Sequence, residues 1–342
     1  MQNEPITLRD IAQRVNMSTA SVSRALAGQT GVGARRAAHI QQIAAELGYR
    51  PRPLRRNRAQ AIAVLVGTDQ PGYPDEDFSQ RLVILAARAI GDLGLHVHLE
   101  FVSRQDNGKA LPVVLRENRV DGVLLAGHPS GDLLKFVEDH DIPAVVLGGS
   151  CEWVARPCVN PDPSAAVREA IDRLIGHGHR RIGLAISDRK YPVTERLYQV
   201  CRGTLAERGL DLPDTHVVDG LTPDLVGGQI AIQRFLDAGG SIPTGVLFTN
   251  DWMALGGLCA LVERGYRVGE DVSIIGQDNL PWTNQTQPAL SSIDHHEAGM
   301  LGAAVRSLKE QIEGRFAEPE DITVTSRLVW RRSCGPAPRG PS

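Results

Sequence analysis

Apolar residues recur three and four positions apart in three short segments near the start of the chain, residues 8–15, 19–26 and 34–47. This spacing places them on one face of a helix in each segment, so three helices can pack around a small common core. Asn16 is suited to the turn between the first two helices, and Ser18 is suited to cap the second. The pattern therefore predicts a three-helix unit that contains a helix-turn-helix. The expected core positions are Leu8, Ile11, Ala12, Val15, Val22, Ala25, Leu26, Ile40, Ile43, Ala44 and Leu47.

From residue 61 onward, short apolar runs alternate with longer amphipathic segments. This βαβ order predicts parallel sheets with helices on both faces, and its repetition predicts two α/β lobes. Ligands in such folds bind outside the carboxyl ends of the strands, so the lobes are expected to enclose a cleft between them. The expected strands are 61–66, 95–101, 120–127, 142–148, 181–186, 216–220, 244–250 and 271–276. The expected helices are 78–93, 108–118, 131–140, 296–313, and four that begin near 162, 195, 223 and 251.

These patterns divide the chain into a headpiece (1–50), a linker (51–60), a two-lobed domain (61–330) and a tail (333–342). The first lobe is expected to comprise about 61–158 and 292–320, and the second about 159–289 and 321–332. Pro53 restricts the linker to a short or irregular conformation. The tail, SCGPAPRGPS, is rich in proline and glycine and has no heptad pattern, so it is expected to be flexible.

Composition places the chain among globular proteins, with 342 residues, 42% hydrophobic and 23% charged. It contains no long apolar run, and its start, MQNEPITLRD, lacks the features of a secretory signal. We therefore expect a cytoplasmic protein with no membrane partner. The five cysteines are scattered and never in C-x-x-C spacing, so we expect reduced thiols and neither a disulfide framework nor a zinc site.

Charge is distributed unevenly along the chain. Residues 1–60 hold ten arginines and three acidic residues, a net of +7, whereas the remainder has 27 basic and 37 acidic residues, a net of −10. A basic module on an acidic body indicates a polyanion partner for the first 60 residues, although a solvated charged surface is the alternative.

A helix-turn-helix inserts its second helix into the major groove of DNA, with the N-terminal residues of that helix at the base edges. Arg24 is suited to a bidentate contact with guanine, and Ser18, Ser21 and Ser23 are suited to phosphate oxygens. The alternative for each of these residues is a polar side chain that faces solvent.

The runs TLRDIAQRVNMSTASVSRAL and AAELGYRP closely resemble the headpiece of the LacI/GalR (lactose-repressor) family of bacterial regulators. The resemblance implies that Thr19 and Ala20 select the operator sequence and that Arg24 contacts a base. Thr7, the expected N-cap of the first helix, is also counted among the DNA-binding residues. This chain departs from the family pattern at Gly33-Ala34-Arg35-Arg36, where Arg35 and Arg36 are expected to replace the usual phosphate contacts.

The linker also departs from the family pattern, because the first strand begins roughly four residues early. Family members carry a short hinge helix with a leucine that wedges into the minor groove. Leu54 is the candidate wedge here, and Arg55, with its neighbouring arginines, is expected to contact the DNA backbone.

The two-lobed region resembles the effector domain of the same family at LIGHGHRRIGL, PTGVLFTNDWMALGGLCAL and GEDVSIIGQDNLP. The resemblance implies an effector site that contains Phe78, Arg196, Asn250 and Asp278. Asn250 and Asp278 end predicted strands, where hydrogen-bonding groups can converge on hydroxyls, and Arg196 supplies a rigid fork. Trp282 is a candidate for stacking on a ring, with a packing role as its alternative. Gln277 stands where the family usually has an aromatic residue.

The function expected from these features is that of a dimeric repressor that binds a pseudo-palindromic operator in double-stranded DNA and is switched by a small-molecule effector, a sugar or related metabolite. An exported solute-binding protein has the same two-lobed architecture but needs a signal sequence and no basic headpiece. An enzyme is disfavoured because no nucleophile elbow, HExxH or P-loop occurs. No catalytic residue, cofactor or metal is expected, and His177 and His179 are interpreted as structural or surface histidines.

Overall fold

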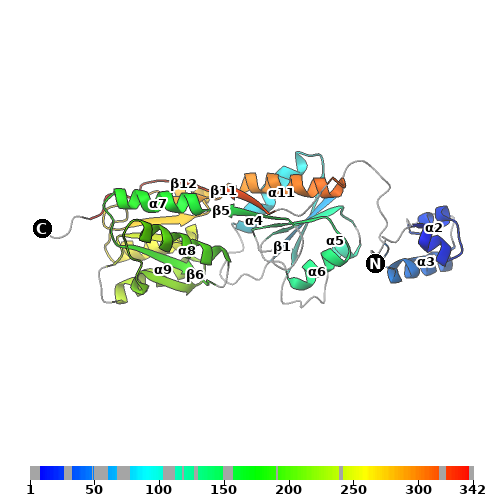
Figure 1. Cartoon of the computed structure of the whole chain (residues 1–342), viewed down its shortest axis with the longest axis horizontal. Helices are drawn as coiled ribbons and strands as arrows, with labels where there is room; N and C mark the ends of the chain where they lie inside the picture. The colour runs from blue at the N-terminus through cyan, green and yellow to red at the C-terminus, as the bar shows by residue number, and fades with distance from the viewer. Residues whose placement is uncertain are drawn as a thin grey trace.

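The computed structural model describes residues 8–26, 33–47, 49, 61–67, 78–102, 112–117, 119–126, 130–148, 157–189, 192–238, 242–315 and 321–338. These residues form a three-helix unit and two α/β lobes (Figure 1). The fold class expected from the sequence is confirmed. Thr7, the linker 51–60 with Leu54 and Arg55, and the last four residues of the tail lie outside the described residues.

The three helices near the N-terminus share one small core. The side chains of Ile11, Val22 and Ile40 are fully buried at its centre. Asn16 adopts the expected left-handed conformation, with φ of 51°, and the Oγ atom of Ser18 accepts a hydrogen bond of 3.2 Å from the backbone N–H of Ser21. The turn at Asn16 and the cap at Ser18 that the sequence predicts are therefore both present in the helix-turn-helix. The helices are α1 (Leu8–Arg14), α2 (Thr19–Leu26) and α3 (Ala34–Glu46).

The first lobe is built on a six-stranded parallel sheet in the order β11-β5-β4-β3-β1-β2. Successive residues of β1 enter different cores, Ile62 beneath α4 and α11 and Ala63 beneath α5 and α6, because side chains alternate across a strand. The expected helix at 108–118 is described only as the four-residue α5. The elements are β1 (Ala61–Gly67), α4 (Phe78–Gly91), β2 (His96–Val102), α5 (Val113–Arg116), β3 (Gly122–Ala126), α6 (Gly131–Asp139), β4 (Ala144–Leu147), β5 (Cys158–Asp162), α11 (Glu297–Ile312) and β11 (Ile322–Thr325).

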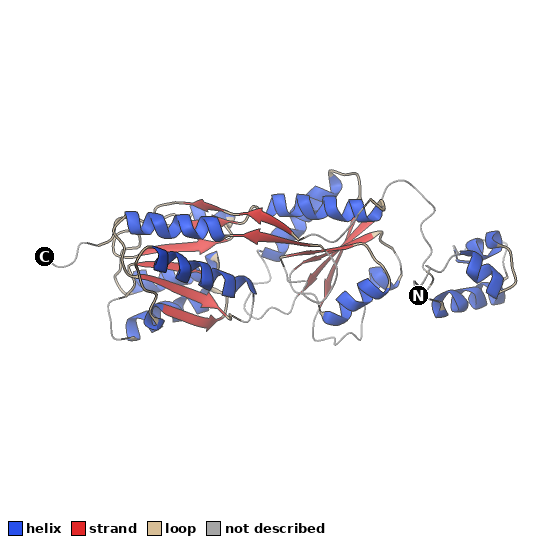
Figure 2. Ribbon diagram, in the orientation of Figure 1, coloured by secondary structure: helices blue, strands red, loops and turns tan. Residues whose placement is uncertain are grey.

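The second lobe repeats this plan with the order β12-β10-β9-β8-β6-β7, in which only the β10–β12 pair is antiparallel. Helices α7 and α8 cover one face, and α9 and α10 cover the other (Figure 2). The elements are α7 (Ser164–Gly176), β6 (Ile182–Ser187), α8 (Pro192–Glu207), the 3₁₀ turn η2 (Asp214–His216), β7 (Val217–Leu221), α9 (Leu225–Asp237), β8 (Gly245–Phe248), α10 (Asp251–Glu263), β9 (Ser273–Gln277), the 3₁₀ turn η3 (Pro281–Asn284), β10 (Ser291–Asp294) and β12 (Arg327–Val329).

Three segments of the chain cross between the lobes: β5 leads into α7, β10 leads into α11, and β11 leads into β12. These crossings shift the expected lobe boundaries by a few residues. The first lobe extends to Asp162 and includes 322–325, because β5 pairs with both β4 and β11. The second lobe extends to Asp294, because β10 pairs with β9 and β12.

The expectation of a flexible tail is wrong for residues 333–338, which pack against the second lobe. Ser333 is fully buried, and its hydroxyl donates to the carbonyl of Ile274 (2.7 Å) and accepts from the N–H of Ser291 (2.8 Å). The carbonyl of Gly335 lies 3.0 Å from Nε2 of His179, which is itself buried. Composition suggested flexibility, but these bonds to distant strands order the segment.

The structure changes the interpretation of the cysteines. Cys158 is disulfide-bonded, which corrects the expectation of five reduced thiols, whereas Cys201, Cys259 and Cys334 are free. Spacing along the chain does not report which sulfur atoms meet in space, so the sequence could not reveal this bond.

Among the described helices, none has the length and apolar character needed to cross a membrane.

Candidate functional site

The first candidate site is the outer face of α2. Thr19 and Ser18 are exposed at its start, whereas Val22 and Ala25 are buried against the other two helices. The hydroxyls of Ser18 and Ser21 lie 2.9 Å apart. The side chains of Ala20, Ser23 and Arg24 lie outside the described residues. The core thus fixes the helix from one side and leaves its N-terminal end, where backbone N–H groups have no intrahelical partner, open to a ligand.

The start of α3 carries positive charge beside this helix. Arg35 and Arg36 are both exposed in its first turn. Gly33 precedes the helix and supplies no side-chain cap. Exposed guanidinium groups at the positive end of a helix dipole favour an anion such as a phosphate.

The second candidate site is a polar cluster between the lobes, centred on the turn that follows β9. Asp278 and Asn279 have φ of 101° and 49°, and for Asp278 in particular this backbone conformation is strained. Burial, together with the nearby Asp251 and Glu297 carboxylates, raises the pKa of Asp278. A strained acidic residue at the carboxyl end of a central strand is placed as a ligand contact would be.

Asn279 uses all four of its polar groups to hold this turn. Its backbone N–H donates to Ser292 Oγ (2.9 Å), and its Nδ2 donates to Asp294 Oδ2 (3.3 Å). Its Oδ1 accepts from Arg331 Nη2 (2.6 Å), and its backbone carbonyl accepts from Arg81 Nη1 (3.3 Å). Because Arg81 belongs to the first lobe, the turn is a contact between the lobes.

Asp251 supports the same turn from the start of α10. Its Oδ2 accepts from the N–H of Leu280 (2.8 Å), and its Oδ1 accepts from the hydroxyl of Ser292 (2.6 Å). Burial raises the pKa of Asp251 to about 7. The Asp251 carboxyl therefore links α10, the turn and β10, which fixes the turn within the second lobe.

The three crossings meet beside this cluster. Nδ1 of His295 lies 2.9 Å from Oγ of Ser326, and the N–H of Ser326 donates to the carbonyl of Asp162 (3.0 Å). Burial lowers the pKa of His295 to about 4, so the imidazole is neutral at pH 7. Arg327 donates to Asp294 at 2.8 Å. Burial alone would raise the pKa of Asp294, but the His296 N–H and Arg327 lower it.

The predicted effector residues occupy different environments in this region. Asp278 lies in the turn, and Arg196 is half exposed on α8, with Nη2 3.4 Å from Asp162. Trp282 packs at 5.0 Å against Trp252, and its Nε1 is buried without a hydrogen-bond partner among the described residues. The side chain of Phe78 lies outside those residues, although its backbone begins α4.

Asn250 differs from the other candidates, because its amide is used locally. The side chain is buried, its Oδ1 accepts from the N–H of Met253 (2.8 Å), and its Nδ2 donates to the carbonyl of Pro223 (2.8 Å). It caps α10 and so positions Asp251 in the next residue.

Sequence reasoning missed Arg81, Asp251 and Glu297. Asp251 directly follows Asn250 at the end of a predicted strand, and this position was the available signal. Arg81 and Glu297 give no local signal, because each is an ordinary charged residue near the start of a helix. Within the described residues, no group of three histidine, cysteine or acidic side chains could hold a metal ion.

Two family models match parts of this chain. The model for "Bacterial regulatory proteins, lacI family" matches residues 7–52, and that for "Periplasmic binding protein-like domain" matches residues 171–334. The HTH-type transcriptional regulator MalR of Streptomyces coelicolor is 30% identical over 348 residues, which cover 97% of each chain. The HTH-type transcriptional repressor CytR of Escherichia coli (strain K12) is 27% identical over 337 residues, again 97% of each chain.

Solved structures show the same architecture. The transcriptional regulator CelR in complex with cellobiose has a TM-score of 0.70 and 25% identity, and the match covers 96% of this chain and 99% of that one. The lac repressor dimer bound to operator and the anti-inducer ONPF shares the fold, with a TM-score of 0.69, 22% identity and the same coverage. The relatives are transcriptional regulators, which favours that role over an exported solute-binding protein or an enzyme. The chain belongs to the lacI family of bacterial regulatory proteins.

Proposed function

We propose that this DNA-binding regulator is a homodimeric repressor whose affinity for its operator is set by a small molecule bound between the two lobes. The observation that carries the proposal is the exposed, Ser18-capped start of α2 on a headpiece joined to two lobes with three crossings. The residues that contact base edges are Thr19, Ala20 and Arg24. The residues that contact phosphates are Ser18, Ser21, Ser23, Arg35, Arg36 and Arg55. Leu54 enters the minor groove, and Thr7 also contacts the DNA. Its DNA partner places its action in the cytoplasm.

We assign residues 1–50 to DNA binding, 51–60 to the linker, and the two lobes to effector binding and dimerisation. A ligand that binds the turn at Asp278 in one lobe and also touches the other lobe favours one angle between them. In a dimer that angle sets the separation of the headpieces, and operator half-sites accept only certain separations.

The effector site that we propose comprises Asp278, Arg196, Trp282 and Phe78, with Asn250 as the cap that holds Asp251 in place. Asp278 suits ligand hydroxyls, and the half-exposed Arg196 can leave its long contact with Asp162 for a ligand. The Nε1–H of Trp282, which has no hydrogen-bond partner in the described part of the chain, is a further donor near the same turn. Hydroxyl-rich metabolites such as sugars fit this set.

A thermal-shift screen tests the effector site, with cellobiose, other sugars, sugar phosphates and nucleosides as the probes. A ligand that fills the cleft stabilises the folded chain according to its concentration relative to its dissociation constant. Asp278→Asn should abolish the shift of any compound that binds the cleft, whereas Asp214→Asn, at an exposed residue on η2, should preserve it.

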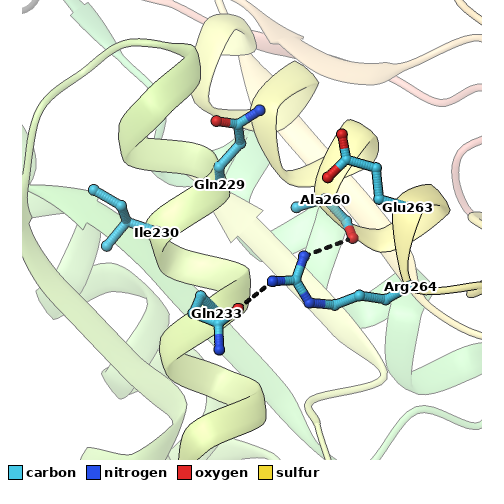
Figure 3. Close-up of a pocket in the computed structure, with 6 residues that line it drawn as sticks. All are labelled: Gln229, Ile230, Gln233, Ala260, Glu263 and Arg264. Atoms are coloured by element: carbon cyan, nitrogen blue, oxygen red, sulfur yellow. Dashed lines mark hydrogen bonds between the residues drawn. The ribbon is translucent and has the colours of Figure 1, made fainter.

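We further propose that exposed apolar side chains form the dimer surface. In the second lobe these are Val226 and Ile230 on α9 and Val262 on α10, which are 54%, 40% and 54% exposed. A cavity of about 270 Å³ lies between the two helices, lined in part by Ile230, Gln233 and Arg264 (Figure 3). Arg264 donates to Gln233 on α9 and to the carbonyl of Ala260 on its own helix. In the first lobe we include Ile84 on α4 and Leu99 and Phe101 on the edge strand β2, but not the exposed Val113 on α5.

The regulator function is tested by a gel-shift assay with DNA from upstream of the gene for this chain. The proposal expects a complex that resists excess unrelated duplex and weakens steeply as salt rises, because bound phosphates release counterions. Equal binding to both duplexes would count against sequence-specific regulation.

A further inference from the structure

Arg81 is the side chain through which α4 reaches across to the second lobe. Its Nε lies 2.6 Å from Oε2 of Glu297, at the start of α11 in its own lobe. Its Nη1 donates to the backbone carbonyl of Asn279, 3.3 Å away in the other lobe. One planar guanidinium therefore joins two helices of the first lobe to the turn after β9.

The turn that Arg81 contacts cannot move independently of the second lobe. Asn279 is bonded by its other three polar groups to Ser292, Asp294 and Arg331, and the next residue is bonded to Asp251. Asp278, the residue before it, has φ of 101°, and its Oδ1 lies 3.8 Å from Nε2 of His295. Because Asp278 and Asn279 are consecutive, a change in the backbone conformation of Asp278 moves the Asn279 carbonyl directly.

The first-lobe partner of Arg81 is equally constrained. Glu297 is only 6% exposed, so its carboxylate depends on Arg81 for a counter-charge. Glu297 also lies three residues after Asp294, at the second crossing. On α4 itself, Arg81 lies one helical turn after Phe78 and one turn before the exposed Ile84, so it stands between the proposed effector and dimer surfaces.

We propose that Arg81 is a positioning residue for the allosteric switch: its simultaneous contacts with Glu297 and the Asn279 carbonyl form a latch that fixes the angle between the lobes and carries the state of the Asp278–Asn279 turn to α4. This inference rests on the proposed function. When the effector binds Asp278, the Asn279 carbonyl shifts. The hydrogen bond from Arg81 to that carbonyl then forms or breaks, and α4 moves relative to the second lobe. The coupling is a change in one interlobe contact between two states of the hinge.

Hydrogen exchange measured by mass spectrometry on the free full-length chain tests the latch. The variants are Arg81→Met, which keeps the aliphatic stem, and Arg88→Met as the matched control, an exposed arginine in the last turn of the same helix. Arg81→Met should accelerate exchange about tenfold in peptides that contain residues 278–280, 294–297 and 326–327, because a charged hydrogen bond across the lobes is lost. Arg88→Met should match the wild type.

Small-angle X-ray scattering on the same samples measures the radius of gyration, which would not change if the substitution only loosened the structure locally. Arg81→Met should increase the radius of gyration of the two-lobed body, and Arg88→Met should not. Arg81→Lys should give an intermediate result in both measurements, because one ammonium keeps the charge but lacks the fork needed for both contacts.

Two results would overturn the latch. One is wild-type exchange and scattering in Arg81→Met. The other is acceleration spread evenly over β3 and β6, because this would mean that Arg81 supports folding in general. Should Arg81→Met not fold, Glu297→Gln decides the matter, since it keeps the side-chain shape and must reproduce the local acceleration. Neither DNA nor effector is present, so failure of the latch is distinguishable from failure of the proposed function.

Discussion

Nδ1 of His295 lies 2.9 Å from Oγ of Ser326, so two of the three segments that cross between the lobes meet at this contact. Burial lowers the pKa of His295 to about 4 from the usual 6.5. The unfolded chain therefore binds a proton at this residue between pH 6.5 and pH 4 while the folded chain does not, and stability is lost as the pH falls through that window.

His295→Gln should remove this part of the acid sensitivity. On lowering the pH from 7 to 5, the wild type should lose about 1–2 kcal/mol more unfolding free energy than the variant. Urea denaturation at both pH values measures the difference, and His96→Gln, at an exposed residue of β2, is the control. An equal pH response in wild type and His295→Gln would contradict the assignment.

The close approach of α9 and α10 depends on glycine. A Cβ atom at Gly228 would lie 1.9 Å from the backbone carbonyl oxygen of Met253, whereas a Cβ at Gly203 in α8 has open space around it. Gly228→Ala should lower the unfolding free energy by about 1–3 kcal/mol or more through overpacking. Gly203→Ala should raise it by about 0.5–1 kcal/mol through helix propensity. Thermal and urea unfolding check the pair, and similar effects at both sites would refute the packing argument.

The packed C-terminal segment makes a separate prediction. Ser333→Ala removes the partner of the buried Ser291 N–H and one of two donors to the Ile274 carbonyl, which also accepts from Cys334 Sγ. The unfolding free energy should fall by about 1–3 kcal/mol, because the buried Ser291 N–H is left unpaired. Thr215→Ala, at an exposed hydroxyl on η2, should change it little. An unchanged unfolding free energy in Ser333→Ala would contradict the packing of this segment and support the expectation of a flexible tail.

Charge on the proposed dimer surface should separate the subunits. Ile230→Asp places a carboxylate on an exposed apolar face of α9, and light scattering after size exclusion should show a monomer at micromolar concentration. Val113→Asp, a similar change on α5 in the first lobe, should leave the dimer intact. A dimeric mass for Ile230→Asp, or a monomeric mass for the unmodified chain, would reject the surface.

The sequence was sufficient for the headpiece and for most strands because their signals are local. The Ser18 cap, the Asn16 turn and the spacing of Ile11, Val22 and Ile40 all lie within a few residues of one another. The position of Asp278 directly after a strand was predictable for the same reason, because the apolar run of that strand is a local signal.

The strands that lead into the crossings, β5 and β10, escaped prediction because their stability is not local. Strand β5 contains Pro161, and β10, with the sequence SSID, has a single large apolar residue, so neither has a clear strand pattern. Each is a strand because of the partners beside it. Arg81 and Glu297 were missed likewise, because their contact joins residues far apart in the chain.

Fluorescence anisotropy of a labelled duplex from upstream of the gene for this chain tests most directly whether α2 recognises DNA. The full chain should bind that duplex more tightly than a shuffled duplex of equal composition across a salt series. Arg24→Gln should remove about 1–3 kcal/mol of this preference, and Arg202→Gln, with the same charge change at an exposed residue of α8 in the second lobe, should keep it. Equal affinity of the unmodified chain for both duplexes at every salt concentration would contradict the account.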